Sequence, residues 1–298
     1  MDATVPDLVA DVACGTGENP LWHPEEELLY WADIPAGRVY TYDPAADDYE
    51  LLYEDPEERI GGFTFEEDGA LLLFQEAGAV RRYEDGTVET VVAPDPDEFD
   101  ERFNDVIADP EGRVYCGVMP DPDNDVPGAL YRLDHDGTFE CIEPEVGLPN
   151  GMDFTEDLST MYFTDSCAHD DRPGIIYRYD YDRATGELSN RETVIESHGM
   201  LGFNDGMTLD EDDHIWSAYW GGHGIVRFAP DGTRERTVRI GPPKVSSLTF
   251  GGPDLDQAYV TTAAEEGRLV EGDSAGSLFR VDLEIGGRPE FYSSIATE

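Results

Sequence analysis

Short segments of alternating apolar and polar residues follow one another along the whole chain. The most regular unit is an apolar stretch, a few loop residues, a glycine and a segment rich in Arg and Tyr, as in LLYWADIPAGRVYTYDP and IWSAYWGGHGIVRFAPDG. Its six copies have their glycines at Gly37, Gly78, Gly128, Gly174, Gly224 and Gly276. Neighbouring glycines lie 41 to 52 residues apart, and a period of this length indicates a repeat fold.

Each period contains four short predicted strands. A turn such as EDG, DHDG or APDG follows each copy, and another apolar strand such as TVETVV comes after it. An alternating segment that ends in an acidic turn, such as DPEG, precedes each copy. Turns of this kind join antiparallel strands, and no window shows sustained helical periodicity.

The pattern therefore predicts an all-β fold, a six-bladed β-propeller with four antiparallel strands per blade. We expect residues 1–298 to form a single domain. A β-sandwich or a pair of small β domains is the alternative, which would not explain the regular period. An exposed strand edge invites association, so the segment around Asp7–Ala13 is expected to pair with the last blade.

A polar residue recurs at one position of the predicted blades. Counting back ten residues from each second strand, or eleven in blades four and six, gives Glu18, Gly61, Asn104, Asn150, Asp205 and Ser247. The innermost strands of a propeller start beside its axis, so these residues are expected to converge. Their carboxylate and amide oxygens suit one divalent cation such as Ca²⁺, Mg²⁺ or Mn²⁺, and the lack of His and Cys argues against a dedicated zinc site. For any one residue alone, a turn-forming role before Gly is the simpler interpretation.

Three long loops are expected to crown the same face, at 120–127, 167–173 and 263–275. Loops on a rigid scaffold often select a substrate. Arg102, two residues before Asn104, can hold ligand oxygens by fork-like hydrogen bonds, although a surface ion pair is equally consistent with its position. His169 and His223 lie in crown loops, and their roles stay open. Ser247 has no accompanying His–Asp pair, which disfavours a serine hydrolase.

The net charge of the chain excludes two kinds of partner and indicates a kind of source organism. The 298 residues include 67 Asp and Glu against 19 Lys and Arg, a formal net charge of -48. Such a surface repels nucleic acid and anionic membranes, and 39% apolar residues still suffice for a core. Lys244 is the only lysine, which with the acidity predicts a protein of a salt-accumulating halophile.

The sequence also favours a cytoplasmic location. It contains no membrane-spanning run, and its N-terminus has no basic, apolar signal segment. The four cysteines are scattered, without a CxxC pair, and are expected to be buried in a reducing compartment.

Four motifs together resemble the senescence-marker-protein/gluconolactonase/regucalcin family: GENPLW, RFND, LPNGMDF and NDGMTLD. The resemblance spans essentially the whole chain and implies a six-bladed propeller that hydrolyses sugar lactones. It implies one divalent metal bound by Glu18, Asn150 and Asp205, with Asp205 also the general base. It implies that Arg102 and Asn104 contact the substrate. The ion's identity stays open among Ca²⁺, Mg²⁺, Mn²⁺, Fe²⁺ and Zn²⁺.

Two positions depart from the family pattern. Asn19 stands where family members often have Gly, which should matter little. The loop after Met119 differs in composition from the animal members, and the family's substrate-contacting acidic residue there could correspond to Asp121.

The predicted function is therefore metal-dependent hydrolysis of a sugar aldonolactone to the aldonic acid, by a gluconolactonase- or xylonolactonase-like enzyme in sugar oxidation. We expect a monomer whose partner is the small-molecule lactone. A phosphotriesterase-like hydrolase on the same scaffold is one alternative, and a non-enzymatic calcium-binding or partner-binding propeller is another. A pocket-facing Arg102 favours a polyhydroxylated ligand over an apolar ester.

Overall fold

The computed structural model describes residues 5–93, 101–121, 123, 125–167, 174–197 and 201–295. Over these residues, the strands form six antiparallel sheets of four strands each. The predicted fold class, a six-bladed β-propeller, is thereby confirmed. The chain divides into two compact units of three sheets each, and each unit is described by itself.

The first unit comprises Met1–Pro56 and Ser197–Glu290. One sheet contains β2 (Gly17–His23), β3 (Leu28–Asp33), β4 (Arg38–Asp43) and β5 (Asp48–Glu54). The next contains β18 (Phe203–Leu209), β19 (Ile215–Trp220), β20 (Gly224–Phe228) and β21 (Arg234–Arg239). The third contains β22 (Val245–Gly251), β23 (Gln257–Thr262), β24 (Leu278–Asp282) and β1 (Asp7–Ala10).

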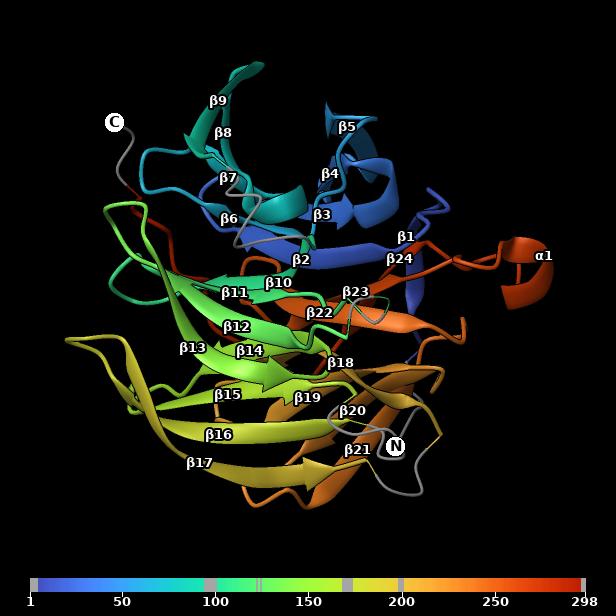
Figure 1. Ribbon diagram of the computed structural model, residues 1–298. Coiled ribbons are helices and arrows are strands. Elements are labelled where there is room, and N and C mark those ends of the chain that lie inside the picture. Colours follow the sequence, from blue (N-terminus) through green and yellow to red (C-terminus); the bar gives the residue numbers. More distant parts are fainter. Residues whose placement is uncertain are drawn as a thin grey trace. The chain divides into compact units, whose positions relative to one another are not determined.

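The second unit comprises Glu57–Glu196 and Phe291–Glu298. One sheet contains β6 (Gly62–Phe65), β7 (Leu71–Phe74), β8 (Val80–Glu84) and β9 (Thr87–Val92). The next contains β10 (Phe103–Ala108), β11 (Val114–Val118), β12 (Gly128–Leu133) and β13 (Phe139–Val146). The third contains β14 (Pro149–Phe154), β15 (Thr160–Asp165), β16 (Ile175–Asp182) and β17 (Glu187–Glu196), which lie side by side in chain order (Figure 1).

Helical structure is minor, as the lack of helical periodicity predicted. Two short 3-10 turns, η1 (Ile34–Ala36) and η2 (Glu76–Gly78), follow β3 and β7. In the part of the chain that the structure describes, the one α-helix is α1 (Arg268–Glu271), which projects from the loop before β24 (Figure 1). None of the described helices has the length and apolarity that a bilayer crossing requires.

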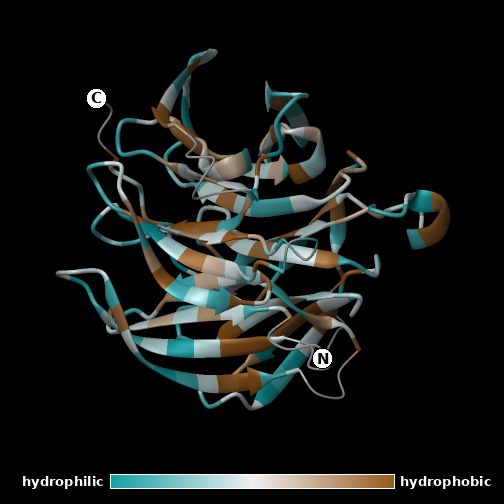
Figure 2. Cartoon of the chain, viewed as in Figure 1, coloured by the Kyte–Doolittle hydropathy of each residue, from teal (hydrophilic) through white to brown (hydrophobic). Residues whose placement is uncertain are grey.

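Burial decreases from the first strand of a sheet to the last. All residues of β2 and β22 are buried, whereas β17 and β21 carry mostly exposed side chains. Buried and exposed residues alternate along the second half of β16, so that one face of the strand is buried. Figure 2 shows lighter and teal segments alternating on the outer strands of this sheet. The inner strands are thus enclosed by their neighbours and form a rigid base for any residue that they carry.

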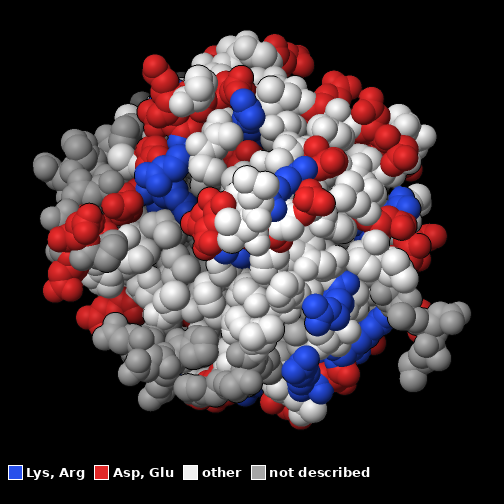
Figure 3. All heavy atoms as spheres, turned by 90° about the vertical axis from the view of Figure 1, so that its right-hand side faces the viewer, with Lys and Arg blue, Asp and Glu red and all other residues white. Residues whose placement is uncertain are grey.

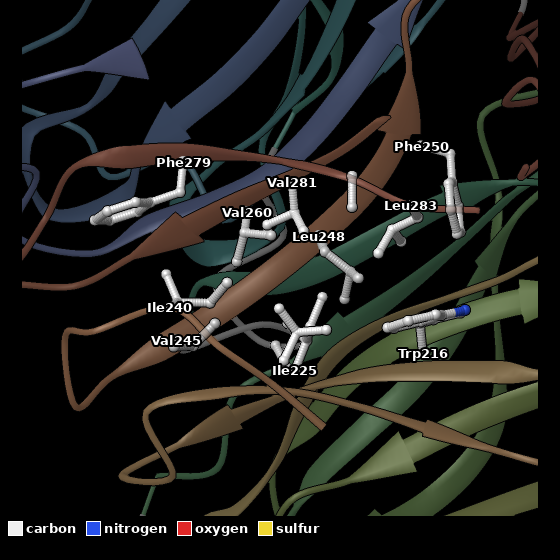
Figure 4. Packing of buried hydrophobic residues seen from close by; sticks show 13 residues of the cluster. Trp216, Ile225, Ile240, Val245, Leu248, Phe250, Val260, Phe279, Val281 and Leu283 are labelled. Carbon is white, nitrogen blue, oxygen red and sulfur yellow. The ribbon is translucent and has the colours of Figure 1, made fainter. Parts of the chain in front are cut away.

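In the first unit, an apolar cluster joins the β18–β21 sheet to the β22–β24 sheet. Leu248, Val260 and Val281 lie opposite Ile225 and Trp216 (Figure 4). The Trp216 ring meets Phe250 edge-on, with centroids 6.4 Å apart. Each fully buried side chain of this size stabilises the fold by roughly 1.5–3 kcal/mol. The cluster therefore packs β19 and β20 against β22 and β23.

The last sheet is completed by the N-terminal strand. β1 pairs antiparallel with β24, with Asp7 opposite Arg280 and Ala10 opposite Leu278. The Cys14 N–H donates to Gly276 O at 2.8 Å and continues the link. The predicted pairing of the Asp7–Ala13 segment with the last blade is confirmed.

The cysteines differ from the expectation that all four would be buried. Cys14 and Cys116 are buried, but Cys141 and Cys167 are exposed, and all four are free thiols. Cys141 lies on β13, the last strand of its sheet, and Cys167 lies in a loop just after β15, so neither position has a further layer to cover it.

Candidate active site

The inner strands depart from regular pairing at or beside the positions that the sequence singled out. Among the described strands, five of the six inner strands shift register against their neighbour, at Glu18/Leu21, Phe103/Val106, Asn150/Met152, Asn204/Met207 and Val245/Ser247. In the remaining blade β6 pairs with β7 without a shift, and its aligned residue is Gly61. A bulge redirects a side chain and is common beside active sites. The repeated bulges therefore lie at or beside the positions of the candidate residues, whose roles stay a prediction.

In the second unit, Arg102, Asn104 and Asn150 are joined by hydrogen bonds. Arg102 Nη1 donates to Asn104 Oδ1 at 2.8 Å and to Phe103 O at 2.8 Å. Asn104 Nδ2 donates to Asn150 Oδ1 at 2.8 Å and to Pro149 O at 2.7 Å. Asn150 Nδ2 in turn donates to Ser166 Oγ at 2.8 Å. Three of the predicted residues of this unit thus form one polar cluster, and Arg102 is not a detached surface ion pair.

Gly61 has no room for a side chain beside this cluster. A Cβ atom at Gly61 would lie 2.0 Å from Phe103 O and 2.9 Å from Asn104 N. Blade two therefore approaches Asn104 with its backbone and contributes no polar side chain at the aligned position.

In the first unit, Glu18 and Asp205 lie on the two strands that pack against β22. Both side chains are buried, with 7% and 4% of their surface exposed. Ser246 Oγ donates to Gly17 O at 2.5 Å, next to Glu18. A Cβ atom at Gly206, next to Asp205, would lie 2.2 Å from Ser247 Oγ. The serines of β22 thus lie between the two predicted carboxylates.

Asn19 explains one departure from the family pattern. Its backbone φ is 49°, in the left-handed region, and it lies within the bulge of β2. Glycine adopts this conformation most easily and asparagine is the residue that tolerates it next best. Asn19 can therefore replace Gly without disturbing Glu18, and its N–H donates to Glu18 Oε2 at 3.2 Å.

The donor chemistry of these positions fits a hard divalent cation. Glu18 and Asp205 offer carboxylate oxygens in the first unit, and Asn150 offers an amide oxygen in the second. Asn150 Oδ1 accepts one hydrogen bond and keeps a second lone pair for a ligand. Within the described residues, no three His, Cys, Asp or Glu side chains gather at a metal-sized site.

The remaining predicted residues are placed as follows. Asp121 is buried, and its Oδ1 accepts a hydrogen bond from Asp123 N at 3.0 Å. It lies two residues beyond Met119, and the Met119 N–H donates a hydrogen bond to Arg102 O. The substrate role of Asp121 stays a prediction. His223 Nδ1 hydrogen-bonds to Gly241 O at 2.9 Å. His169 lies outside the described residues.

The loop over residues 263–275 is anchored to the first unit by the single lysine. Lys244 Nζ lies 2.8 Å from Glu265 Oε2 and 2.7 Å from Glu271 Oε1. The same ammonium group lies 5.2 Å from the Trp220 ring centre, within the range of a cation–π contact. One cation thus ties this crown loop to β19 and to the start of β22.

Sequence reasoning missed three polar residues beside the second-unit cluster. Ser166 accepts the Asn150 hydrogen bond. Asp105 follows Asn104 in the bulge of β10, and its removal from water raises the pKa of its carboxyl group. Gln75 is fully buried, and its backbone oxygen accepts a hydrogen bond from Phe103 N. Neither amide atom of its side chain has a hydrogen-bond partner among the described residues. Only Asp105 carried a sequence signal, as part of the RFND motif.

The chain is similar to known proteins over almost its whole length. It is 45% identical to the pentonolactonase XacC of Haloferax volcanii, over 96% of this chain and 97% of that protein. It is 31% identical to regucalcin of Xenopus laevis, over 84% of this chain and 83% of that protein. A solved luciferin-regenerating enzyme matches 98% of this chain and all of its own, with 26% identity and a TM-score of 0.89.

A family model gives the same result. The model described as SMP-30/Gluconolactonase/LRE-like region matches residues 16–264, a span that contains Glu18, Arg102, Asn104, Asn150 and Asp205. The resemblance of the four motifs is thereby confirmed. This chain belongs to the SMP-30/gluconolactonase/LRE-like family.

Proposed function

We propose that this protein is a metal-dependent sugar lactonase that opens an aldonolactone to the aldonic acid, with pentonolactones as its main substrates. The observation that carries the proposal is the set of buried carboxylates and amides at the repeated bulges, with Arg102 hydrogen-bonded into it. The 45% identity to a pentonolactonase supports the substrate class.

Glu18, Asn150 and Asp205 would hold the divalent ion, which is one of Ca²⁺, Mg²⁺, Mn²⁺, Fe²⁺ and Zn²⁺. When bound, such an ion supplies Lewis acidity that polarises the lactone carbonyl and makes a water molecule more acidic. Arg102 donates hydrogen bonds, and Asn104 Oδ1 can accept one besides that from Arg102, so this pair suits the hydroxyl groups of a sugar.

Asp205 is the proposed general base. Its carboxylate takes a proton from water as the water oxygen bonds to the carbonyl carbon. The bond from that carbon to the ring oxygen then breaks, and the ring oxygen takes the proton from Asp205 and leaves as an alcohol. The new carboxylic acid releases its proton to solvent. The product is an aldonate. Little of the Asp205 side chain is exposed, so bulk water competes little for the carboxylate.

The setting of the reaction is part of the proposal. We infer that residues 1–298 act as one domain and as a monomer in the cytoplasm, without nucleic-acid or membrane partners. A sugar lactone is the product of a sugar dehydrogenase, so a dehydrogenase reaction would supply the substrate.

An acid-release assay tests the proposal. The protein, stripped of metal and then supplied with each ion in molar KCl, is offered pentonolactones, hexonolactones and an aryl phosphotriester, and the pH drop is followed. We expect turnover of pentonolactones that EDTA abolishes without unfolding the protein. Turnover of the phosphotriester alone would favour the alternative hydrolase. Calcium binding without any turnover would favour a binding protein, and melting on chelation would make the ion structural.

A further inference from the structure

The Asn150 side chain is held at both ends. Its Oδ1 accepts from Asn104 Nδ2, and its Nδ2 donates to Ser166 Oγ, both at 2.8 Å. Asn150 is 3% exposed and Ser166 is fully buried. The two ends of an amide have nearly the same shape, so these hydrogen bonds decide which end is oxygen.

The hydrogen bonds run in one direction. Arg102 can only donate, so Asn104 must turn its oxygen to Arg102 and its NH₂ to Asn150. Asn150 must then turn its oxygen to Asn104 and its NH₂ to Ser166. A reversed Asn150 amide would set an NH₂ group against the Asn104 NH₂. Arg102, acting through Asn104, thus decides which end of the Asn150 amide is oxygen, and Ser166 holds the NH₂ end by accepting its hydrogen bond.

Ser166 is itself fixed by its backbone. The Ser166 N–H donates to Leu148 O at 2.9 Å, and Gly174 N–H donates to Ser166 O at 3.0 Å. Leu148 lies two residues before Asn150, so Ser166 is attached to the same segment that carries the amide it holds.

We propose that Ser166 is a positioning residue: it holds the Asn150 amide in the orientation that Arg102 and Asn104 select, with its oxygen available to the cation. The inference rests on the metal site of the proposed function. Without the serine oxygen, Asn150 Nδ2 would be buried without this acceptor, and the amide could rotate. Groups that orient a metal ligand typically change metal affinity by about 10- to 100-fold.

The test measures metal affinity directly, by titration calorimetry of chelator-stripped protein with Mn²⁺ and with Ca²⁺ in molar KCl. The variant is Ser166→Ala, and the matched control is Thr164→Val. Thr164 is also fully buried and is the register partner of Asn150, and its Oγ1 has no hydrogen-bond partner in the described part of the chain. Loss of the Thr164 hydroxyl therefore removes no known restraint on Asn150.

We expect Ser166→Ala to raise the Kd about 10- to 100-fold, and Thr164→Val to leave it within about twofold. Saturating metal should restore part of the lost activity in Ser166→Ala, because the substitution weakens metal binding through Asn150 and leaves the general base Asp205 in place. Equal affinity in the two variants would overturn the role of Ser166 while leaving the metal site intact. Absence of ion binding by the unmutated protein would overturn the metal site itself and this inference with it. If Ser166→Ala does not fold, Ser166→Cys, which keeps the size but is a weaker acceptor, decides by the same criterion.

Discussion

Asp205 and Asn104 have different proposed tasks, and substitutions can separate them. Asp205→Asn keeps an oxygen ligand but removes the negative charge and the proton acceptor. We expect kcat to fall about a hundredfold or more, the scale of a lost general base, with metal binding weaker but detectable. Asn104→Ala removes a hold on sugar oxygens and is expected to raise KM more than it lowers kcat. Steady-state kinetics of both variants at saturating metal measure the difference.

The outcome that contradicts this mechanism is an Asp205→Asn enzyme with nearly normal kcat, because the base would then lie elsewhere. A fall of kcat in Asn104→Ala as large as that in Asp205→Asn would also contradict the division of roles. It would indicate that Asn104 acts mainly through Asn150, to which it donates a hydrogen bond.

Gln75 leads to a prediction about stability. A buried amide without partners costs roughly 1–3 kcal/mol of folding free energy. Gln75→Met keeps the length of the side chain and removes both polar atoms, so the free energy of unfolding should rise by about 1 kcal/mol. Denaturant unfolding measures it. Gln257→Met is the control, since Gln257 Oε1 accepts from Tyr259 OH at 3.1 Å and its replacement should give no gain. A loss of stability in Gln75→Met would mean that the amide has a partner outside the described residues.

The sequence predicted the candidate ligand residues, but it did not predict the hydrogen bonds that orient their side chains. Glu18, Asn150 and Asp205 came from counting along a repeat and from motifs, since a repeat places equivalent residues at equivalent positions. Ser166 was not predicted because a single serine after a strand has no periodic or motif signal. The proposed role depends on a hydrogen bond between Asn150, near the start of β14, and Ser166, just after the paired strand β15. Only the folded chain brings these two residues together.

At the scale of elements, the strands followed from the pattern and the bulges did not. Alternation and turn residues predicted four strands per period, because both are local properties of the sequence. A bulge changes the pairing by one residue and leaves the hydrophobic pattern almost unchanged. The aligned residues were therefore found by position, whereas the backbone feature that redirects them, as between Asn150 and Met152, came only from the structure.

The N-terminal strand gives a prediction at this scale. Ala10 is 1% exposed and belongs to the core cluster beside Trp31, whereas Leu8 on the same strand is 45% exposed. Ala10→Asp buries an unpaired charge and should lower the melting temperature by several degrees and promote association through the β24 edge. Leu8→Asp should leave the melting temperature and the association state nearly unchanged. Thermal unfolding followed by light scattering gives the melting temperature and the association of each variant. Equal effects of Ala10→Asp and Leu8→Asp would mean that the buried face of β1 does not hold the strand on the sheet.

For the whole molecule, charge dominates the expected behaviour. The whole sequence has a formal net charge of -48. On the face seen in Figure 3, acidic side chains are spread over the upper part and the sides, with basic ones among them and a group of basic ones at the lower right. Self-repulsion of this size is screened in molar salt, where the Debye length falls to about 3 Å from about 10 Å at 0.1 M. We expect a clearly lower melting temperature in 0.1 M than in molar KCl. A melting temperature independent of salt would contradict the halophilic interpretation.

The pairing of β1 with β24 also determines when the protein can finish folding. Asp7 and Arg280 are 273 residues apart in the chain. At a synthesis rate of about 5–20 residues per second, β1 leaves the ribosome roughly 15–55 seconds before its partner strand exists. During that interval Ala10 and its neighbours have no sheet to join, although later blades can already form. We therefore expect the pairing of β1 with β24 to form late, after nearly all of the described strands have been made.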